Sequence, residues 1–225
     1  MTTAIRFRDV VPNVFDPEWT APVNVDVPEG SFQVIRTTPL RSAPFFRLCV
    51  GLFAAGQGEV EVLGLDPSDL SRPDAQRFRR TLGVALLPDG LISNLSIRMN
   101  IVVPLVYNGA ADVNQATKLA DAALGECGLR NWANNRPASV PPDVRQQAVI
   151  ARAIAHRPRL LLLEDPFSSV KSKDAAVLAG LCRASARTVV ITTHRRNEAL
   201  YQFADRTSFW DDRGYRTDTN EVGSS

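Results

Sequence analysis

Two carboxylates and one histidine stand at the ends of strongly apolar segments of this 225-residue chain. Glu164 and Asp165 come directly after the leucine run 160–163, and His194 follows the segment 188–193. Continuous apolar runs of this length are typical of central parallel strands covered on both faces. Open α/β sheets bind ligands at the carboxyl ends of such strands, and carboxylates and imidazoles are side chains that move protons. We therefore expect these residues at one edge of a sheet, although a single histidine after a strand is more often structural.

A second segment has the setting of a phosphate-binding loop but lacks its residues. Residues 36–43 follow a short predicted strand, 32–35, and lead into an apolar helix predicted over 45–53. In the pattern G-x-x-x-x-G-K-[ST], glycines let backbone N–H groups converge on the phosphates, lysine adds charge and the hydroxyl binds Mg²⁺. The corresponding glycine, lysine and hydroxyl positions hold Arg36 and Arg41, Ser42, and Ala43.

These replacements predict a large loss of phosphate affinity. Pro39 removes one further N–H from the segment. Charge-assisted hydrogen bonds are worth about 1.5–3 kcal/mol each, so losing two or three costs about 3–9 kcal/mol, a factor of hundreds to millions in affinity. One alternative stays open, in which Arg41 partly replaces the lysine as a phosphate contact.

The elements that must position these residues alternate between strand and helix patterns. Strands are predicted over 5–10, 23–27, 32–35, 59–64, 82–87, 159–164 and 188–192. Helices are predicted over 68–80, 116–127, 144–156, 174–185 and 197–204, and a closing hairpin over 207–214. The alternation predicts an α/β fold with a parallel-sheet core, interrupted by a helical insertion between about residues 88 and 144.

Composition limits the partners and the compartment. A net charge of +2 with 44% hydrophobic and 22% charged residues is ordinary for a soluble globular protein and gives no sign of nucleic-acid binding. Cys49, Cys127 and Cys182 lack metal-ligand spacing, so we expect reduced, buried thiols in a cytoplasmic protein. No signal peptide opens the chain and no apolar run approaches the ~18 residues of a membrane span, so any membrane role is expected to be peripheral.

In this order and spacing, the segments resemble the ATP-binding subunit of ABC transporters over essentially the whole chain. Residues 36–43 stand at the family's phosphate loop, Glu164 and Asp165 at its Walker B carboxylates, and His194 at its switch histidine. Leu87 stands at the Q-loop glutamine and Lys171 at the D-loop aspartate. The signature L-S-G-G-Q is replaced by Val140, Pro141, Pro142, Asp143 and Val144.

The resemblance implies that these positions are vestigial. The usual Asp-Glu order is inverted, so Glu164 takes the metal position and Asp165 the water-polarising position, each with the wrong length. The family's signature holds the γ-phosphate of the opposite subunit. Here two prolines delete two donors and Asp143 adds repulsion. Only His194 is intact.

One segment suggests a subgroup of the family. Residues 89–105, D-G-L-I-S-N-L-S-I-R-M-N-I-V-V-P-L, resemble the ATPases of bacterial MCE-type (Mla-like) phospholipid transporters. Lipoprotein-release and cell-division ATPases share part of this pattern. If a transporter is the right context, residues 91–105 are expected to form the docking face for the membrane permease.

The implied fold is a P-loop NTPase-like ABC nucleotide-binding domain. Its α/β core, with a parallel sheet and an N-terminal antiparallel β region, would comprise residues 1–87 and 145–225. Residues 88–144 would form a helical subdomain carrying the altered signature.

The implied function is that of a pseudo-ATPase. ABC sites form between two subunits, and a chain that has lost both its Walker motifs and its signature impairs both sites of a dimer. We therefore expect ATP and Mg²⁺ to be absent or weakly bound. The subunit would be a structural or regulatory partner of a lipid-transporter permease and of a second ABC ATPase subunit, or of itself, on the inner face of the bacterial cytoplasmic membrane. Two alternatives stay open: residual or partner-supported ATP hydrolysis, and a soluble protein-interaction scaffold.

Overall fold

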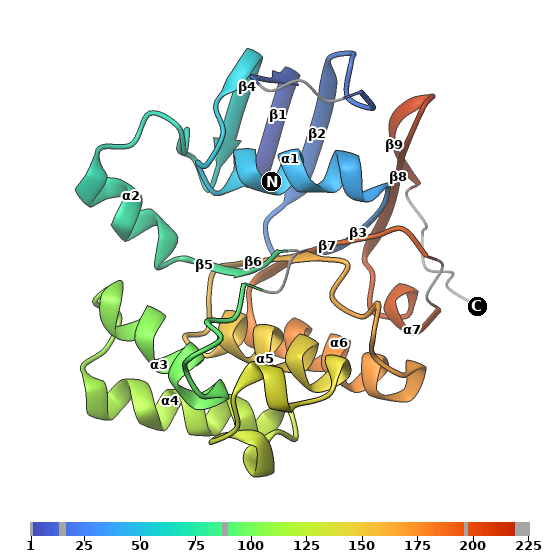
Figure 1. Cartoon of the computed structure of the whole chain (residues 1–225). Helices are drawn as coiled ribbons and strands as arrows, with labels where there is room; N and C mark the ends of the chain where they lie inside the picture. Colours follow the sequence, from blue (N-terminus) through green and yellow to red (C-terminus); the bar gives the residue numbers. More distant parts are fainter. Residues whose placement is uncertain (1, 14–16, 87–89, 196–197, 219–225) are drawn as a thin grey trace.

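Two sheets form the frame of the computed structural model, which describes residues 2–13, 17–86, 90–195 and 198–218 (Figure 1). The smaller sheet is antiparallel, in the order β2 (Val23–Pro28), β1 (Thr3–Pro12), β4 (Ala55–Val62). The larger sheet has the order β5 (Leu82–Ala85), β6 (Leu160–Glu164), β7 (Thr188–Thr193), β3 (Phe32–Arg36), β8 (Arg206–Asp211), β9 (Gly214–Asp218). Its neighbouring strands are parallel except in the β8–β9 hairpin. The predicted α/β fold with an antiparallel N-terminal region is confirmed.

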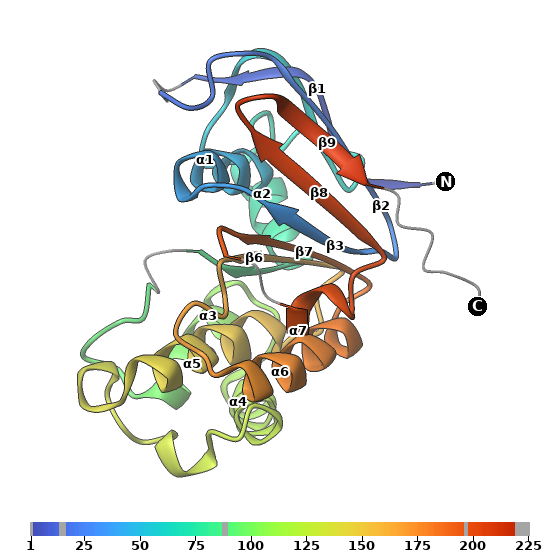
Figure 2. The same cartoon turned by 90° about the vertical axis from the view of Figure 1, so that its right-hand side faces the viewer.

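Helices fill the space between the sheets and cover the far face of the larger one. The helix α1 (Pro39–Cys49) lies between the two sheets, and α2 (Arg72–Arg79) flanks them (Figure 1). Below the larger sheet lie α3 (Ile97–Tyr107), α4 (Val113–Glu126), α5 (Pro142–Ile154), α6 (Ser172–Ser185) and the short α7 (Glu198–Tyr201) (Figures 1 and 2). Two 3₁₀ turns, Arg130–Trp132 and Pro137–Ser139, join α4 to α5.

The leucine run of β6 explains why both faces of the larger sheet are covered. Leu160 and Leu162 belong to the cluster shared with α1 and the smaller sheet, whereas Leu161 and Leu163 belong to the cluster shared with α3–α6. All four are fully buried, and burying each leucine stabilises the fold by about 1.5–3 kcal/mol. The sheet therefore holds the chain segments that follow its strands on a rigid support.

Helix boundaries differ from the predictions at the segments that matter for function. The helix predicted over 45–53 begins at Pro39 and ends at Cys49. Pro39 is favourable there, because its missing N–H and fixed φ suit the first helical position, and the buried Pro44 is tolerated inside the helix. The helix predicted from residue 144 begins at Pro142 for the same reason. The strand predicted over 82–87 ends at Ala85, and Leu87 lies outside the described residues.

Three further expectations concern the cysteines, membrane-spanning helices and the division into domains. All three cysteines are buried and unbonded, and burial raises the pKa of the Cys127 thiol to about 12. Among the helices of the described residues, none has the length and apolarity to cross a membrane. The division into 1–87 with 145–225 and 88–144 stays a prediction, since α5 begins before residue 145 and contacts both β5 and α4.

Candidate functional site

The carboxyl ends of three adjacent strands bring the predicted residues to one edge of the larger sheet. In the parallel register Arg36 of β3 pairs with Thr193 of β7, and Glu164 of β6 pairs with Thr192. The segments that follow these strands therefore converge, namely 37–38 before α1, Asp165 after β6, and His194 after β7. This is the edge where open α/β sheets bind ligands.

Between β3 and α1 the chain has two residues where a long loop was predicted. Thr38 caps α1, its hydroxyl accepting from Arg41 N, and Pro39 occupies the first position of the helix. Thr37 N donates to Thr193 O at 3.0 Å, which ties this short connection to β7. The expectation of a loop over 36–43 was wrong, because the Thr-Pro pair starts a helix there.

Arg41, one of the residues expected in the loop, lies inside the protein. It is only 5% exposed, on the first turn of α1. Arg41 Nε donates to Glu18 O at 2.9 Å and Nη2 donates to Asp212 Oδ1 at 2.5 Å. Its guanidinium is thus held by protein oxygens from two distant segments. Arg36, by contrast, is exposed at the end of β3, and Ala43 is partly buried within α1.

Ser42, at the expected lysine position, binds the expected metal ligand directly. Ser42 Oγ donates to Glu164 Oε1 at 2.8 Å, and both residues are 3% exposed. Since a hydroxyl has one proton, the alternative acceptor Pro39 O at 3.2 Å is the weaker choice. The carboxylate at the metal position is therefore satisfied in part by the chain's own helix.

Asp165 and His194 form a second contact at the same edge. His194 Nδ1 lies 2.9 Å from Asp165 Oδ2, and Arg195 Nε lies 3.1 Å from His194 Nε2. The guanidinium donates to Nε2, and Nδ1 faces the Asp165 carboxylate. Both ring nitrogens are thus engaged, while about a third of the His194 side chain stays exposed.

The backbone and the environment of Asp165 are both unusual. Its φ of 41° is left-handed, a conformation that aspartate tolerates better than most residues. Burial raises the pKa of the Asp165 carboxyl, and His194, the Thr193 hydroxyl and Arg195 act in the opposite direction. Together Asp165 and His194 are an acid–base pair at the protein surface, with Arg195 covering the outer imidazole nitrogen.

The altered signature lies across a small cavity from Glu164. A cavity of about 270 Å³ is lined by Pro142, Arg145, Gln146 and Glu164, among others. Val140 is buried, Pro141 and Pro142 are exposed, and Asp143 is partly buried at the start of α5. The structure thus brings the predicted signature position near the edge, at the N-terminus of α5.

Several residues of this edge were not predicted. Glu18 and Asp212 contact Arg41 from segments far away in sequence, and no local pattern marks them. Gln146 donates to Asp165 O and Ser168 Oγ, each at 3.0 Å, and accepts from Ser169 N at 2.8 Å. Gln146 therefore fixes the turn after β6 to α5, and its place next to the altered signature was the only sequence signal.

Known proteins share this arrangement of elements. No family model matches the chain. The methionine import ATP-binding protein MetN of Xylella fastidiosa is 27% identical over 195 residues, 84% of this chain and 58% of MetN. The cell division ATP-binding protein FtsE of Haemophilus influenzae is 28% identical over 78% of this chain and 82% of FtsE. The dimeric ATP-binding cassette MJ0796, in a post-hydrolysis state bound to ADP and Pi, superposes with a TM-score of 0.82 at 24% identity, over 96% of this chain and 98% of that one.

The chain has the fold of an ABC ATPase nucleotide-binding domain. Its sequence is similar to those of the ATP-binding proteins MetN and FtsE. The chain spans about half the length of the methionine-import relatives it matches.

The donor set at this edge does not fit a nucleoside triphosphate with Mg²⁺. Pro39 has no N–H, Arg41 N faces the Thr38 hydroxyl, and the Arg41 guanidinium is buried against protein oxygens. Within residues 2–13, 17–86, 90–195 and 198–218, no three His, Cys, Asp or Glu side chains are grouped to hold a metal ion. Ser42 and Glu164, at the expected lysine and metal positions, bind each other instead, and Arg41 binds Glu18 and Asp212.

Proposed function

We propose that this chain is a pseudo-ATPase, an ABC subunit that does not itself hydrolyse ATP. It would serve as a structural or regulatory partner in a lipid transporter of the MCE/Mla type, on the inner face of the bacterial cytoplasmic membrane. The observation that carries the proposal is the pair of intrachain contacts at the sheet edge. Arg41 is buried against Glu18 and Asp212, and Ser42 donates to Glu164.

Nucleotide binding and turnover by the purified chain test this proposal. We expect no saturable Mg-ATP binding in calorimetry and no ATP hydrolysis above a buffer blank. The variant Asp165→Asn removes the carboxylate that contacts His194, and Asp69→Asn, at an exposed position before α2, is its matched control. The proposal would be refuted if the chain bound Mg-ATP tightly and hydrolysed ATP, and if Asp165→Asn but not Asp69→Asn abolished the hydrolysis.

A second cavity supports a permease as partner. A cavity of about 310 Å³ lies between the end of α1, α2, β5, α3 and α5. Ile101, Pro104 and Leu105 line it, and they belong to the predicted docking segment 91–105. Met99 of that segment and Leu52 at the rim are exposed apolar side chains, so a segment with apolar side chains would bury surface there.

Co-expression with the candidate permease tests the docking face. The substitutions Leu52→Glu and Met99→Glu place charge on exposed positions and should abolish co-purification. Val177→Glu alters a similarly exposed apolar residue on α6 and should leave it intact. Equal co-purification of all variants would reject this docking face, and the absence of any complex would favour the soluble scaffold.

The proposal also names a lipid as the transported substrate and an ABC ATPase subunit as the dimer partner. The cargo class is supported only by the resemblance of residues 89–105, and the relatives are named for methionine import, cell division and lipoprotein release. The partner would be a second ABC ATPase subunit or a second copy of this chain. Cross-linking of the complex, followed by mass spectrometry, identifies it.

A second candidate function is hydrolysis supported by a partner subunit. The direct contact between Asp165 and His194 favours it, since an acid–base pair has been kept at the sheet edge. ATPase assays of the reconstituted complex separate the two functions. If Asp165→Asn in this chain leaves turnover unchanged, the activity belongs to the partner.

A further inference from the structure

The N-terminus of α1 is covered by a carboxylate of the chain itself. Glu18 Oε2 accepts from the hydroxyl of Thr38, the residue that caps the helix. The same oxygen lies 3.9 Å from Arg41 Nη1, and the Glu18 carbonyl accepts from Arg41 Nε at 2.9 Å. A helix N-terminus carries partial positive charge and favours a nearby anion. Glu18 supplies a negative charge where Thr38, Arg41 and the helix all favour one.

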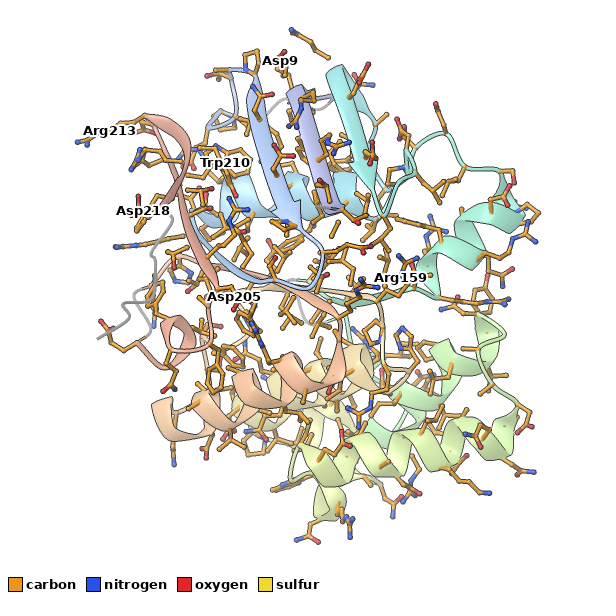
Figure 3. All side chains as sticks on the ribbon, turned by 180° about the vertical axis from the view of Figure 1, so that it is seen from behind. Asp9, Arg159, Asp205, Trp210, Arg213 and Asp218 are labelled. Carbon is orange, nitrogen blue, oxygen red and sulfur yellow. The ribbon has the colours of Figure 1, made fainter. Side chains whose placement is uncertain are left out.

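Packing holds Glu18 in this place. Its neighbour Trp19 is 3% exposed, and Trp19 Nε1 donates to Val10 O at 3.0 Å. The Trp19 ring meets the Trp210 ring edge-on with centroids 4.5 Å apart, and Trp210 O accepts from the Thr37 hydroxyl. Figure 3 shows Trp210 on the hairpin with Arg213 at the tip of its turn. The segments at 18–19, 37–41 and 210–212 are thus joined around the start of α1.

Arg41 has two acidic partners of unequal strength. Asp212 Oδ1 is closer, at 2.5 Å, but the Asp212 side chain is 97% exposed and water screens its charge. The Glu18 side chain is 31% exposed. The Glu18 carboxylate also accepts from the Thr38 hydroxyl, so it is the partner whose loss should matter more.

We propose that the Glu18 carboxylate is a built-in anion that seals the N-terminus of α1 and fastens residues 18–19 to the core. Any external anion must displace it. The proposal deepens the proposed function and rests on it, because it identifies what takes the place of phosphate in a subunit without nucleotide. It also implies that Thr38 and Arg41 can still bind an anion once the carboxylate is removed.

Thermal denaturation of the full chain with inorganic phosphate tests this inference. Glu18→Ala should lower Tm by roughly 3–12 °C, the range for one charge-assisted hydrogen bond in a domain of this size. Phosphate, compared with chloride at equal ionic strength, should then restore Tm in a saturable manner. Glu18→Gln fills the same space without charge and should show a lower Tm without the phosphate response.

Glu61→Ala is the matched control, because Glu61 is a partly exposed carboxylate paired with Arg6. If Glu18→Ala lowers Tm no more than Glu61→Ala, or if phosphate raises Tm equally in all variants, the inference is overturned. Should Glu18→Ala fail to fold, a Tm loss in Glu18→Gln no larger than in Glu61→Gln overturns it. These outcomes are independent of Mg-ATP binding by the unaltered chain, which tests the proposed function.

Discussion

The hydrogen bond between Ser42 and Glu164 gives a measurable test of how the site is built. Ser42 Oγ donates to a carboxylate oxygen at 2.8 Å, and both residues are only 3% exposed. A bond of this kind to a charged group is worth about 1.5–3 kcal/mol. We therefore expect Ser42→Ala to lower the free energy of unfolding by about 1.5–3 kcal/mol, or Tm by roughly 3–12 °C.

A second background separates charge from packing. In a Glu164→Gln chain the same bond joins two neutral groups, so Ser42→Ala should then cost only about 1 kcal/mol. Urea denaturation followed by circular dichroism measures all four proteins of this cycle. Ser139→Ala is the control, because the Ser139 hydroxyl bonds a backbone carbonyl at the surface, and it should change stability by at most about 0.5 kcal/mol.

The reasoning would be refuted by either of two results. One is a cost for Ser42→Ala that is the same in both backgrounds, which would mean that Glu164 is not its charged acceptor. The other is a cost no greater than that of Ser139→Ala. In either case Glu164 would be available to a metal, and the main support for a pseudo-ATPase would be lost.

Three further predictions concern the frame of the site. Gly83→Ala should lose about 1–3 kcal/mol of stability in urea denaturation, because a Cβ at Gly83 would lie 2.2 Å from Ala153 O. His194→Ala should raise the pKa of Asp165 further in an NMR titration, since the nearby imidazole lowers it. The pKa of Asp205 lies below its ordinary 3.8: burial opposes this shift, but hydrogen bonds from Arg183 and Phe32 N outweigh it. Its contribution is therefore full above pH 3.8 and lost as pH falls through the folded pKa, so the stability gap between wild type and Asp205→Asn should stay constant above pH 3.8 and shrink as pH falls below it.

Local patterns were sufficient where burial and strand ends decide the structure. The leucine run 160–163 predicted a central strand because only a strand covered on both faces buries four consecutive leucines. The same logic placed Glu164, Asp165 and His194 at one edge, which the parallel register of β6, β7 and β3 confirms. The start of α1 was missed, because Pro39 was interpreted only as a residue without an N–H, whereas Thr38 and Pro39 together begin the helix.

The sequence by itself determined three things: the α/β frame, the position of Glu164, Asp165 and His194 at strand ends, and the absence of the phosphate-loop residues. All three depend on residue types at short spacing. The tertiary structure alone decided what those residues do instead. From the sequence, Arg41 could be interpreted as a phosphate contact. In the structure it is a buried partner of Glu18 and Asp212, which lie 23 and 171 positions away in the sequence. The bond from Ser42 to Glu164 spans 122 positions, and contacts over such distances are set by packing, which no local pattern records.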